Sequence, residues 1–339
     1  TILDSRLYLP EEWADDANRR KQNYIPDDIE FQTKPQIALD LIDRALGNGV
    51  QVAAWTFDEL YGRDSKFLDA LNERRQAFVA EIPSDTRVWT GKPKVIRRTP
   101  TKTGKGRPRS VPRPARKPPA CEVRNLIKYS SKFQEQSWQR YRIKDTESGP
   151  EVWEVKWLRV WRKTERKLPS KQQTLIVVRN LRTGEVKYFL SNRIVGRGGV
   201  TLRWLLRVAF SRWSIESGFL VAKEELGMDH FQVRGWRCIH RHYYVTALSY
   251  LFCSRTRQRL DGKQSRHLTV EQVRRAVNAY LAHHHLPPAL REETFEKELT
   301  DQRYYQERNA QAKKSHTKTR IQFYRDLGID VDTIKSCVA

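Results

Sequence analysis

The sequence is poor in cysteine and in long apolar runs. Its 339 residues contain four cysteines, and none forms a C-x-x-C pair, so neither a zinc ribbon nor a disulfide framework is indicated. This cysteine usage fits a reducing, intracellular compartment. No apolar run approaches the roughly 18 residues of a membrane span, and no signal peptide is present. We therefore expect a cytoplasmic protein without a membrane segment.

The chain also lacks an initiator methionine. It opens on TILDSRLYLP, in which residues 2–9 alternate weakly between apolar and polar and end at Pro10. This pattern is typical of a strand that then leaves its sheet. An opening in mid-strand predicts that these residues belong to a longer open reading frame.

Acidic residues are missing from one long stretch. Between Thr86 and Cys121 there is no Asp or Glu, whereas twelve Lys or Arg and seven Pro occur. Such a segment cannot bury a core and is predicted to be flexible or polyproline-like. It serves either as a plain linker or as a contact to DNA phosphates, and the two interpretations are compatible. Its candidate DNA-binding residues are Arg97, Arg98, Lys105, Arg107 and Arg109.

Basic residues dominate the whole chain, which has a formal net charge of +24 and a pI of about 10. Hydrophobic residues make up 38% and ten are Trp, so a sizeable core is expected and global disorder is not. A folded chain this basic usually has a polyanionic partner, because neutralising phosphates releases counterions. We favour nucleic acid over ribosome-like or membrane-surface electrostatics.

The first part of the chain alternates helical and strand patterns. Helical spacing occurs over residues 34–49 and 65–76, and short apolar runs occur at 50–57 and 77–83. The run at 50–57 is typical of a buried parallel strand. Together these patterns indicate an α/β domain.

The middle of the chain is predicted to be antiparallel β structure, over residues 122–192. In VWEVKWLRVWRK, period-two spacing places Trp153, Val155, Trp157 and Trp161 on one face. A hairpin turn is expected near Gly184.

Helical patterns return from Thr201 onward. They cover 201–213, 212–227, 239–260 and 268–284. Thr269 is the expected N-cap of the last of these helices, with Gln272 at the spacing of a capping box.

Asp58 directly follows the predicted strand 50–57. Open α/β sheets present ligands and catalytic groups at the carboxyl ends of their strands. The alternative is a plain helix N-cap, which is the commoner use of an Asp in this position.

The helix RWSIESGFLVAKEELG carries charges on one face. Arg212, Glu216 and Lys223 share that face, while the flanking positions are apolar. An ordinary ion-pair ladder would explain the charges, but Arg before Glu is the weaker order for such a pair. The apolar flanks predict that the helix packs on the sheet.

Asp58 and Glu216 together suggest a metal site. Two carboxylates, one at a strand end and one on a later helix, can hold two divalent metals that stabilise the attacking and leaving oxygens of phosphodiester chemistry. Arg212 and Lys223 would then contact the adjoining phosphates.

Three strings in this order resemble the DDE transposases of bacterial insertion sequences, which belong to the RNase H-like, retroviral-integrase superfamily. They are LDSRLYLPEEWADD, WTFDELYGRDSKFL and RWSIESGFLVAKEELGMDHFQVRGWRCIHRH. The last contains R-x3-E-x6-K, formed by Arg212, Glu216 and Lys223, which resembles the signature around the family's last acid. The family often has a Tyr three residues before that Arg, whereas this chain has Ala209.

The resemblance implies an α/β fold: an RNase H-like core with its first strands missing, an antiparallel β insertion and C-terminal helices. It implies the following segments: 1–85, first part of the core; 86–121, basic linker; 122–195, β insertion; 196–260, catalytic helix and rest of the core; 261–339, basic helical region.

The resemblance also assigns site residues and a reaction. Asp58 resembles the second acid and Glu216 the third, while the strand carrying the first Asp would precede this chain, and Asp4 does not replace it. The expected reaction is cleavage of transposon ends and strand transfer, with two Mg²⁺ or Mn²⁺ ions. The expected partner is double-stranded DNA, bound by a homodimer in the synaptic complex, at the nucleoid. Without the first acid, this chain alone should be inactive.

Two other functions remain open. One is a non-catalytic or domesticated DNA-binding remnant of a transposase, and the other is a basic RNA- or ribosome-associated protein. Histidines add little: His283, His284 and His285 suit a helix C-terminus, and His240 and His242 are structural or near phosphate. The basic, aromatic stretch 303–325 is equally compatible with DNA contact and with a solvated helix.

Overall fold

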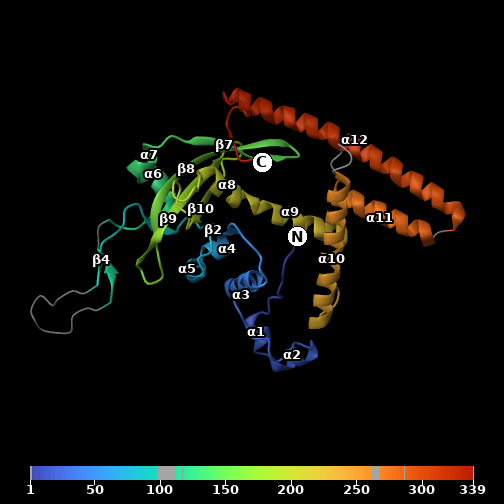
Figure 1. Cartoon of the computed structure of the whole chain (residues 1–339), viewed down its shortest axis with the longest axis horizontal. Coiled ribbons are helices and arrows are strands. Elements are labelled where there is room, and N and C mark those ends of the chain that lie inside the picture. Colours follow the sequence, from blue (N-terminus) through green and yellow to red (C-terminus); the bar gives the residue numbers. More distant parts are fainter. Residues whose placement is uncertain (1, 98–110, 116–117, 262–267, 286, 339) are drawn as a thin grey trace, which may run out of the picture. The chain divides into compact units, whose positions relative to one another are not determined.

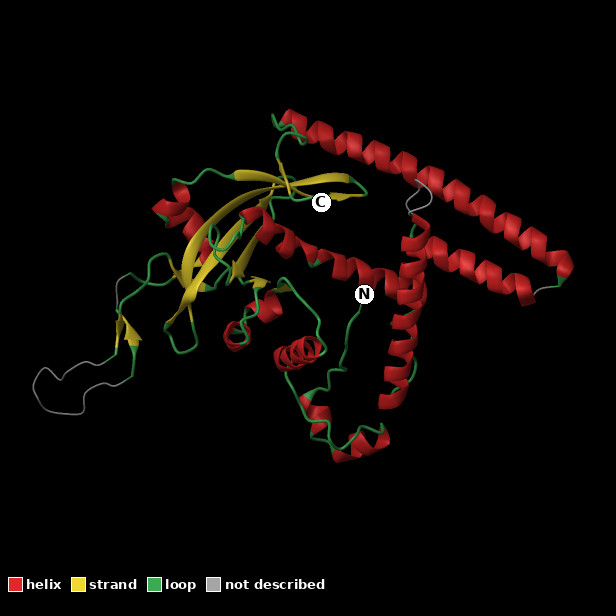
Figure 2. Ribbon diagram, in the orientation of Figure 1, coloured by secondary structure: helices red, strands yellow, loops and turns green. Residues whose placement is uncertain are grey.

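The computed structural model describes residues 2–97, 111–115, 118–261, 268–285 and 287–338. The chain divides into two compact units, one of Thr1–Val50 with Trp213–Ser315 and one of Gln51–Arg212 with His316–Ala339. Figure 1 traces the chain and Figure 2 distinguishes its helices from its strands. Each unit therefore combines segments that are distant in sequence.

The second unit is built on a curled mixed sheet (Figure 2). Its strands are β1 Trp55–Phe57, β2 Phe78–Glu81, β3 Arg87–Trp89, β6 Cys121–Glu122, β7 Gln139–Thr146, β8 Gly149–Lys163, β9 Pro169–Asn180, β10 Val186–Ser191 and β11 Lys335–Ser336. The spatial order is β1-β2-β10-β9-β8-β3-β6, and β7 pairs with β8 and β11. β1 and β2 run parallel, whereas β2 to β6 in this order are joined by antiparallel pairs. A separate pair joins β4 Val95–Ile96 to β5 Arg113–Pro114.

The long strands β8, β9 and β10 form the antiparallel meander predicted from their patterns. In β9, Leu175, Ile176, Val177 and Val178 are fully buried, so both faces of this strand are covered. β-branched residues such as these favour strands because they pack well on a pleated surface. Gly184 has a φ of +72° in the β9–β10 turn, as a tight hairpin requires.

Helices cover this sheet on opposite faces. The helices of the unit are α4 Glu59–Gly62, α5 Ser65–Glu73, α6 Val123–Tyr129, α7 Ser131–Gln134 and α8 Leu202–Ser211. α8 begins at Thr201, whose side chain accepts a hydrogen bond from the backbone of Trp204. Its fully buried Leu205 and Leu206 pack in one core cluster with Val79 of β2 and Phe189 of β10. Burial of each such leucine is worth about 1.5–3 kcal/mol, so α8 is firmly attached to the sheet.

The end of the chain closes the second unit. β11 runs parallel to β7, and the backbone N–H of Cys337 donates to the carbonyl of Arg142. Tyr324, on the last part of α12 (Pro288–Asp326), is buried, and its hydroxyl accepts a hydrogen bond from the backbone of Val152 at 3.1 Å. The stretch 303–325 thus ends in a packed segment, while Tyr304 and Tyr305 are exposed.

The first unit is helical. It contains α1 Glu11–Ala14, α2 Ala17–Gln22, α3 Lys34–Gly47, α9 Trp213–Leu226, α10 Trp236–Asp261, α11 Val270–His285 and the first part of α12. Thr33 and Gln36 form a capping box at α3, and Thr269 and Gln272 form the predicted one at α11. Buried Cys253 of α10 packs with Val270 and Val273 of α11 and with Val221 of α9.

Residues 2–9 do not form the predicted strand. The segment follows α3 through ion pairs, with Arg6 at 3.3 Å from Asp40 and Asp4 at 3.1 Å from Arg44. Because Leu3 is 65% exposed, the weak alternation reflects no buried sheet face.

Other expectations need smaller changes. The run 50–57 yields only the short, half-buried edge strand β1, and two helices, α6 and α7, precede the strands of 122–192. The mixed α/β architecture with C-terminal helices is confirmed, whereas the five-segment division stays a prediction.

Candidate functional site

Asp58 lies at the carboxyl end of β1. Its side chain accepts a hydrogen bond from the backbone of Leu60 at 3.0 Å, so it is the N-cap of the short helix α4. The N-cap interpretation is therefore correct, and it leaves the second carboxylate oxygen available for other contacts. Burial, together with the negative charge of Asp58, raises the pKa of the Tyr61 phenol, which places Tyr61 in the surroundings of this acid.

The residues on either side of Asp58 pack toward α5. The ring of Phe57 meets Phe67 of α5 with centroids 4.8 Å apart, and the ring of Tyr61 packs against both. Tyr61 therefore lies on the α5 face of the sheet together with Phe57.

Glu81 ends β2 at the same edge of the sheet at which Asp58 follows β1. The parallel register joins Phe57 to Ala80, and Asp58 and Glu81 are the next residues along the chain after this pair. Glu81 also stands opposite Phe189 of β10, whose ring packs in the α8 cluster. Two carboxylates thus come from the ends of the two parallel strands.

Cations surround Glu81. Arg212, the C-cap residue of α8, has a guanidinium nitrogen 3.9 Å from its carboxylate, and Lys187 of β10 has its ammonium 3.4 Å away. The three side chains are only 17–27% exposed, so the pairs are weakly screened by solvent. Arg212 therefore lies near the end of β2, and its role in phosphate binding stays a prediction.

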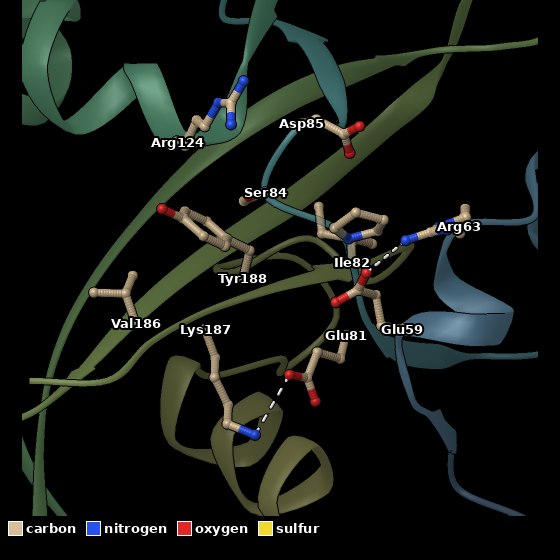
Figure 3. A pocket seen from close by; sticks show the side chains of 11 residues that line it. Glu59, Arg63, Glu81, Ile82, Ser84, Asp85, Arg124, Val186, Lys187 and Tyr188 are labelled. Carbon is tan, nitrogen blue, oxygen red and sulfur yellow. Dashed lines mark hydrogen bonds and ion pairs between the residues drawn. The ribbon is translucent and has the colours of Figure 1, made fainter. Parts of the chain in front are cut away.

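A pocket of about 370 Å³ opens next to these strand ends (Figure 3). Glu81 and Lys187 point toward each other across one side of it, and Glu59 of α4 pairs with Arg63 on another. The remaining lining residues are Ile82, Pro83, Ser84, Asp85, Arg124, Val186 and Tyr188. Both acidic and basic side chains line the pocket. Such a lining suits a polar ligand that has both hydrogen-bond donors and acceptors.

Glu216 and Lys223 lie on α9 and are exposed. They belong to the first unit and Asp58 to the second, so their grouping with Asp58 stays a prediction. The apolar flanks of this helix behave differently from our expectation, because Trp213, Ile215, Phe219 and Leu220 are 42–54% exposed. Within the second unit, α8 packs on the sheet.

The basic segment is only partly described. Arg97 is exposed. Arg98, Lys105, Arg107 and Arg109 lie outside the described residues.

Among the described residues, no group of three or more His, Cys, Asp or Glu side chains is placed to hold a metal ion. In the same part of the chain, no helix is long and apolar enough to cross a membrane. His283, His284 and His285 end α11, as predicted. His240 and His242 lie on α10 and are held by the carbonyls of Trp236 and Gly227, at 2.8 and 2.9 Å.

The part of the chain that carries Asp58 and Glu81 resembles a known protein family. Residues 1–150 match the family model described as DDE superfamily endonuclease. The match to the DDE superfamily endonucleases spans Asp58 and Glu81 and ends before Arg212 and Glu216. It covers less than half of the 339 residues. No curated protein matches the sequence.

The endonuclease match implies phosphodiester chemistry with DNA as substrate. DDE endonucleases typically use divalent metals, and carboxylates such as Asp58 and Glu216 have the donor chemistry that Mg²⁺ prefers.

Sequence reasoning missed Glu81 because only the first parallel strand was followed to its end. The same rule applied to AFVAEIP would have selected this acid as well.

Proposed function

We propose that this protein is a DDE transposase that cleaves the ends of an insertion sequence and joins them to target DNA. The supporting observation is the position of Asp58: it stands at the carboxyl end of β1, inside the region that matches DDE superfamily endonucleases. A carboxylate at this edge of an α/β sheet is where catalytic groups are presented. The proposal includes an RNase H-like fold for the core that carries Asp58.

Asp58 and Glu216 would hold the metals as the second and third acids of the site. Bound Mg²⁺ or Mn²⁺ would supply charge stabilisation for the oxygens of the scissile phosphate. Arg212 and Lys223 would bind the adjoining phosphates, and a homodimer would hold the two transposon ends together.

DNA cleavage tests the proposal. We expect the protein to bind transposon-end duplexes, and a form in which all three acids of the site are present to nick them with Mg²⁺. In that form, Asp58→Asn and Glu216→Gln should each abolish nicking while DNA affinity stays roughly the same. Nicking by Glu216→Gln at the wild-type rate would refute the site assignment.

Lys223→Ala should act differently from the acid variants. A phosphate-binding residue contributes to affinity and positioning, so its loss should weaken end binding and nicking together. DNA binding without nicking by every form would instead support a non-catalytic remnant.

A further inference from the structure

Glu81 forms ion pairs with Arg212 and Lys187, and the proposed function gives it no role of its own. We propose that Glu81 is a positioning residue, which holds the Arg212 guanidinium at the end of β2 so that it meets a DNA phosphate in a fixed orientation. This inference rests on the proposed function, since it takes DNA as the ligand of Arg212.

The backbone of Glu81 is fixed from two sides. Gly62 of α4 approaches it so closely that an added Cβ would lie 1.8 Å from the Glu81 carbonyl oxygen. On the next residue, the N–H of Ile82 donates to the carbonyl of Tyr188 at 2.8 Å. The carboxylate is therefore attached to a part of the sheet that cannot move freely.

Arg212 is anchored at its base by α8. This helix packs through Leu205, Leu206 and Ala209, all buried, and Arg212 follows its last residue. The side chain beyond that base is long, and the 3.9 Å ion pair with Glu81 restricts it. Arg carries five N–H donors in a planar fork, so a guanidinium can contact more than one acceptor group, and its pairing with Glu81 sets the direction in which the fork points.

Charge alone predicts the opposite effect of removing Glu81. An acidic group at a DNA-binding surface repels phosphates, so Glu81→Gln should strengthen binding if Glu81 acts only as a charge. If Glu81 positions Arg212, the same substitution should weaken binding despite the lost repulsion. The sign of the change therefore separates the two roles.

The experiment measures the Kd of the full chain for a fluorescently labelled duplex carrying a transposon end. Arg212→Ala should raise the Kd about tenfold, the effect of one charge-assisted hydrogen bond. Glu81→Gln should raise it several-fold, and the double variant should bind no more weakly than Arg212→Ala alone. The matched control is Glu165→Gln, an acid that does not line the pocket, which pairs with Lys66 at 3.7 Å and should leave binding unchanged or tighter.

A second variant covers the case in which Glu81→Gln unfolds, as melting curves would show. Glu81→Asp keeps the charge but shortens the side chain by one methylene, so it should also weaken binding if reach matters. Binding by Glu81→Gln as tight as by Glu165→Gln, or full additivity with Arg212→Ala, overturns the inference. Failure of the wild-type chain to bind duplex DNA would instead overturn the proposed function.

Discussion

At the scale of single residues, Gly62 controls how closely α4 approaches β2. A Cβ at this position would stand 1.8 Å from the carbonyl oxygen of Glu81 and 2.9 Å from its carbon, and both are backbone atoms that cannot turn aside. We expect Gly62→Ala to lower the free energy of unfolding by about 1–3 kcal/mol, the usual cost of overpacking. Thermal or urea unfolding measures this.

Gly47→Ala is the control for Gly62→Ala. Gly47 ends α3, and an added Cβ there meets nothing within 4 Å. Alanine is the better helix former, so this variant should be neutral or more stable by up to about 1 kcal/mol. Equal stability of the two variants would contradict the close contact.

Cys337 offers a second test at this scale. Burial raises the pKa of its thiol to about 11, outweighing the opposing effect of Arg203 and Arg207. Its thiolate population at neutral pH is therefore about 100-fold below that of an ordinary cysteine. We expect iodoacetamide to label exposed Cys238 well before Cys337, as peptide mass spectrometry would show.

The same pKa determines how stability depends on pH. The unfolded chain loses this proton near the ordinary thiol pKa of 9.0 and the folded chain only at a pKa of about 11, so the folded state binds more protons between these two pH values. The contribution of Cys337 to stability is thus intact below about pH 9 and lost as the pH rises toward 11. Cys337→Ser should flatten that part of the stability profile. Rapid labelling of Cys337 in the native state would contradict the burial.

Sequence reasoning reached some site residues and missed others for a physical reason. Asp58 could be predicted because a strand end is visible in an apolar run. The neighbour relation between Asp58 and Glu81 could not, since it depends on which strands pair and in which register. The ion pair of Arg212 with Glu81 depends on the same pairing.

At the scale of elements, a buried arginine joins α5 to the sheet. Arg162 of β8 is 4% exposed, and its guanidinium donates to Asp69 of α5 at 2.6 Å and to Ser65. Burial raises the pKa of Asp69 although Arg162 lowers it, so removal from water costs more than the pairing regains.

Breaking this pair from one side should be costly. We expect Asp69→Asn to destabilise the protein by about 3 kcal/mol, because it removes the carboxylate that pairs directly with the buried guanidinium. Glu73→Gln, at an exposed position of the same helix, should change stability by less than about 0.5 kcal/mol. Chemical denaturation of both variants tests this prediction. Similar denaturation midpoints would show that the pairing of Arg162 with Asp69 contributes little to stability.

Elements with strong local signals could be predicted and weakly patterned ones could not. The capping residues Thr269 and Gln272 marked the start of α11 correctly. The segment 2–9 was predicted to be a strand from a weak alternation of apolar and polar residues. Its polar residues Asp4 and Arg6 form ion pairs with α3 instead of marking the exposed face of a strand. For α9, apolar residues were taken as a sign of burial, yet Ile215 and Leu220 are more than half exposed.

At the scale of the whole molecule, the net charge of +24 predicts how DNA binding responds to salt. Replacing the four cations at positions 98, 105, 107 and 109 with Gln should reduce the slope of log Kd against log salt. Each lost phosphate contact removes roughly 0.9 units of that slope. Fluorescence anisotropy at several salt concentrations measures it.

The control for this prediction keeps the same change of charge at other places. Lys21, Lys128, Arg166 and Lys171 are exposed and can be replaced by Gln together. If this variant lowers the slope as much as the first, the segment has no special part in binding, and only the total charge matters.

The antiparallel strands could be predicted at this scale, but their place in the molecule could not. Their hydrophobic pattern indicates a separate β insertion, whereas β10 pairs directly with β2 and continues the same sheet. Such pairing joins residues more than 100 positions apart, as Ser191 and Phe78 show through a hydrogen bond with a separation of 113. Local periodicity carries no information on contacts of that range.

The burial of Tyr324 against β8 also determines the order in which the protein can be completed on the ribosome. Val152 and Tyr324 are separated by 172 positions, so translation delivers β7 and β8 long before the residues that cover them. During that interval Val152 and its neighbours face water, a state in which nascent chains aggregate or engage chaperones. The second unit is therefore finished only after nearly the whole of α12 has been synthesised.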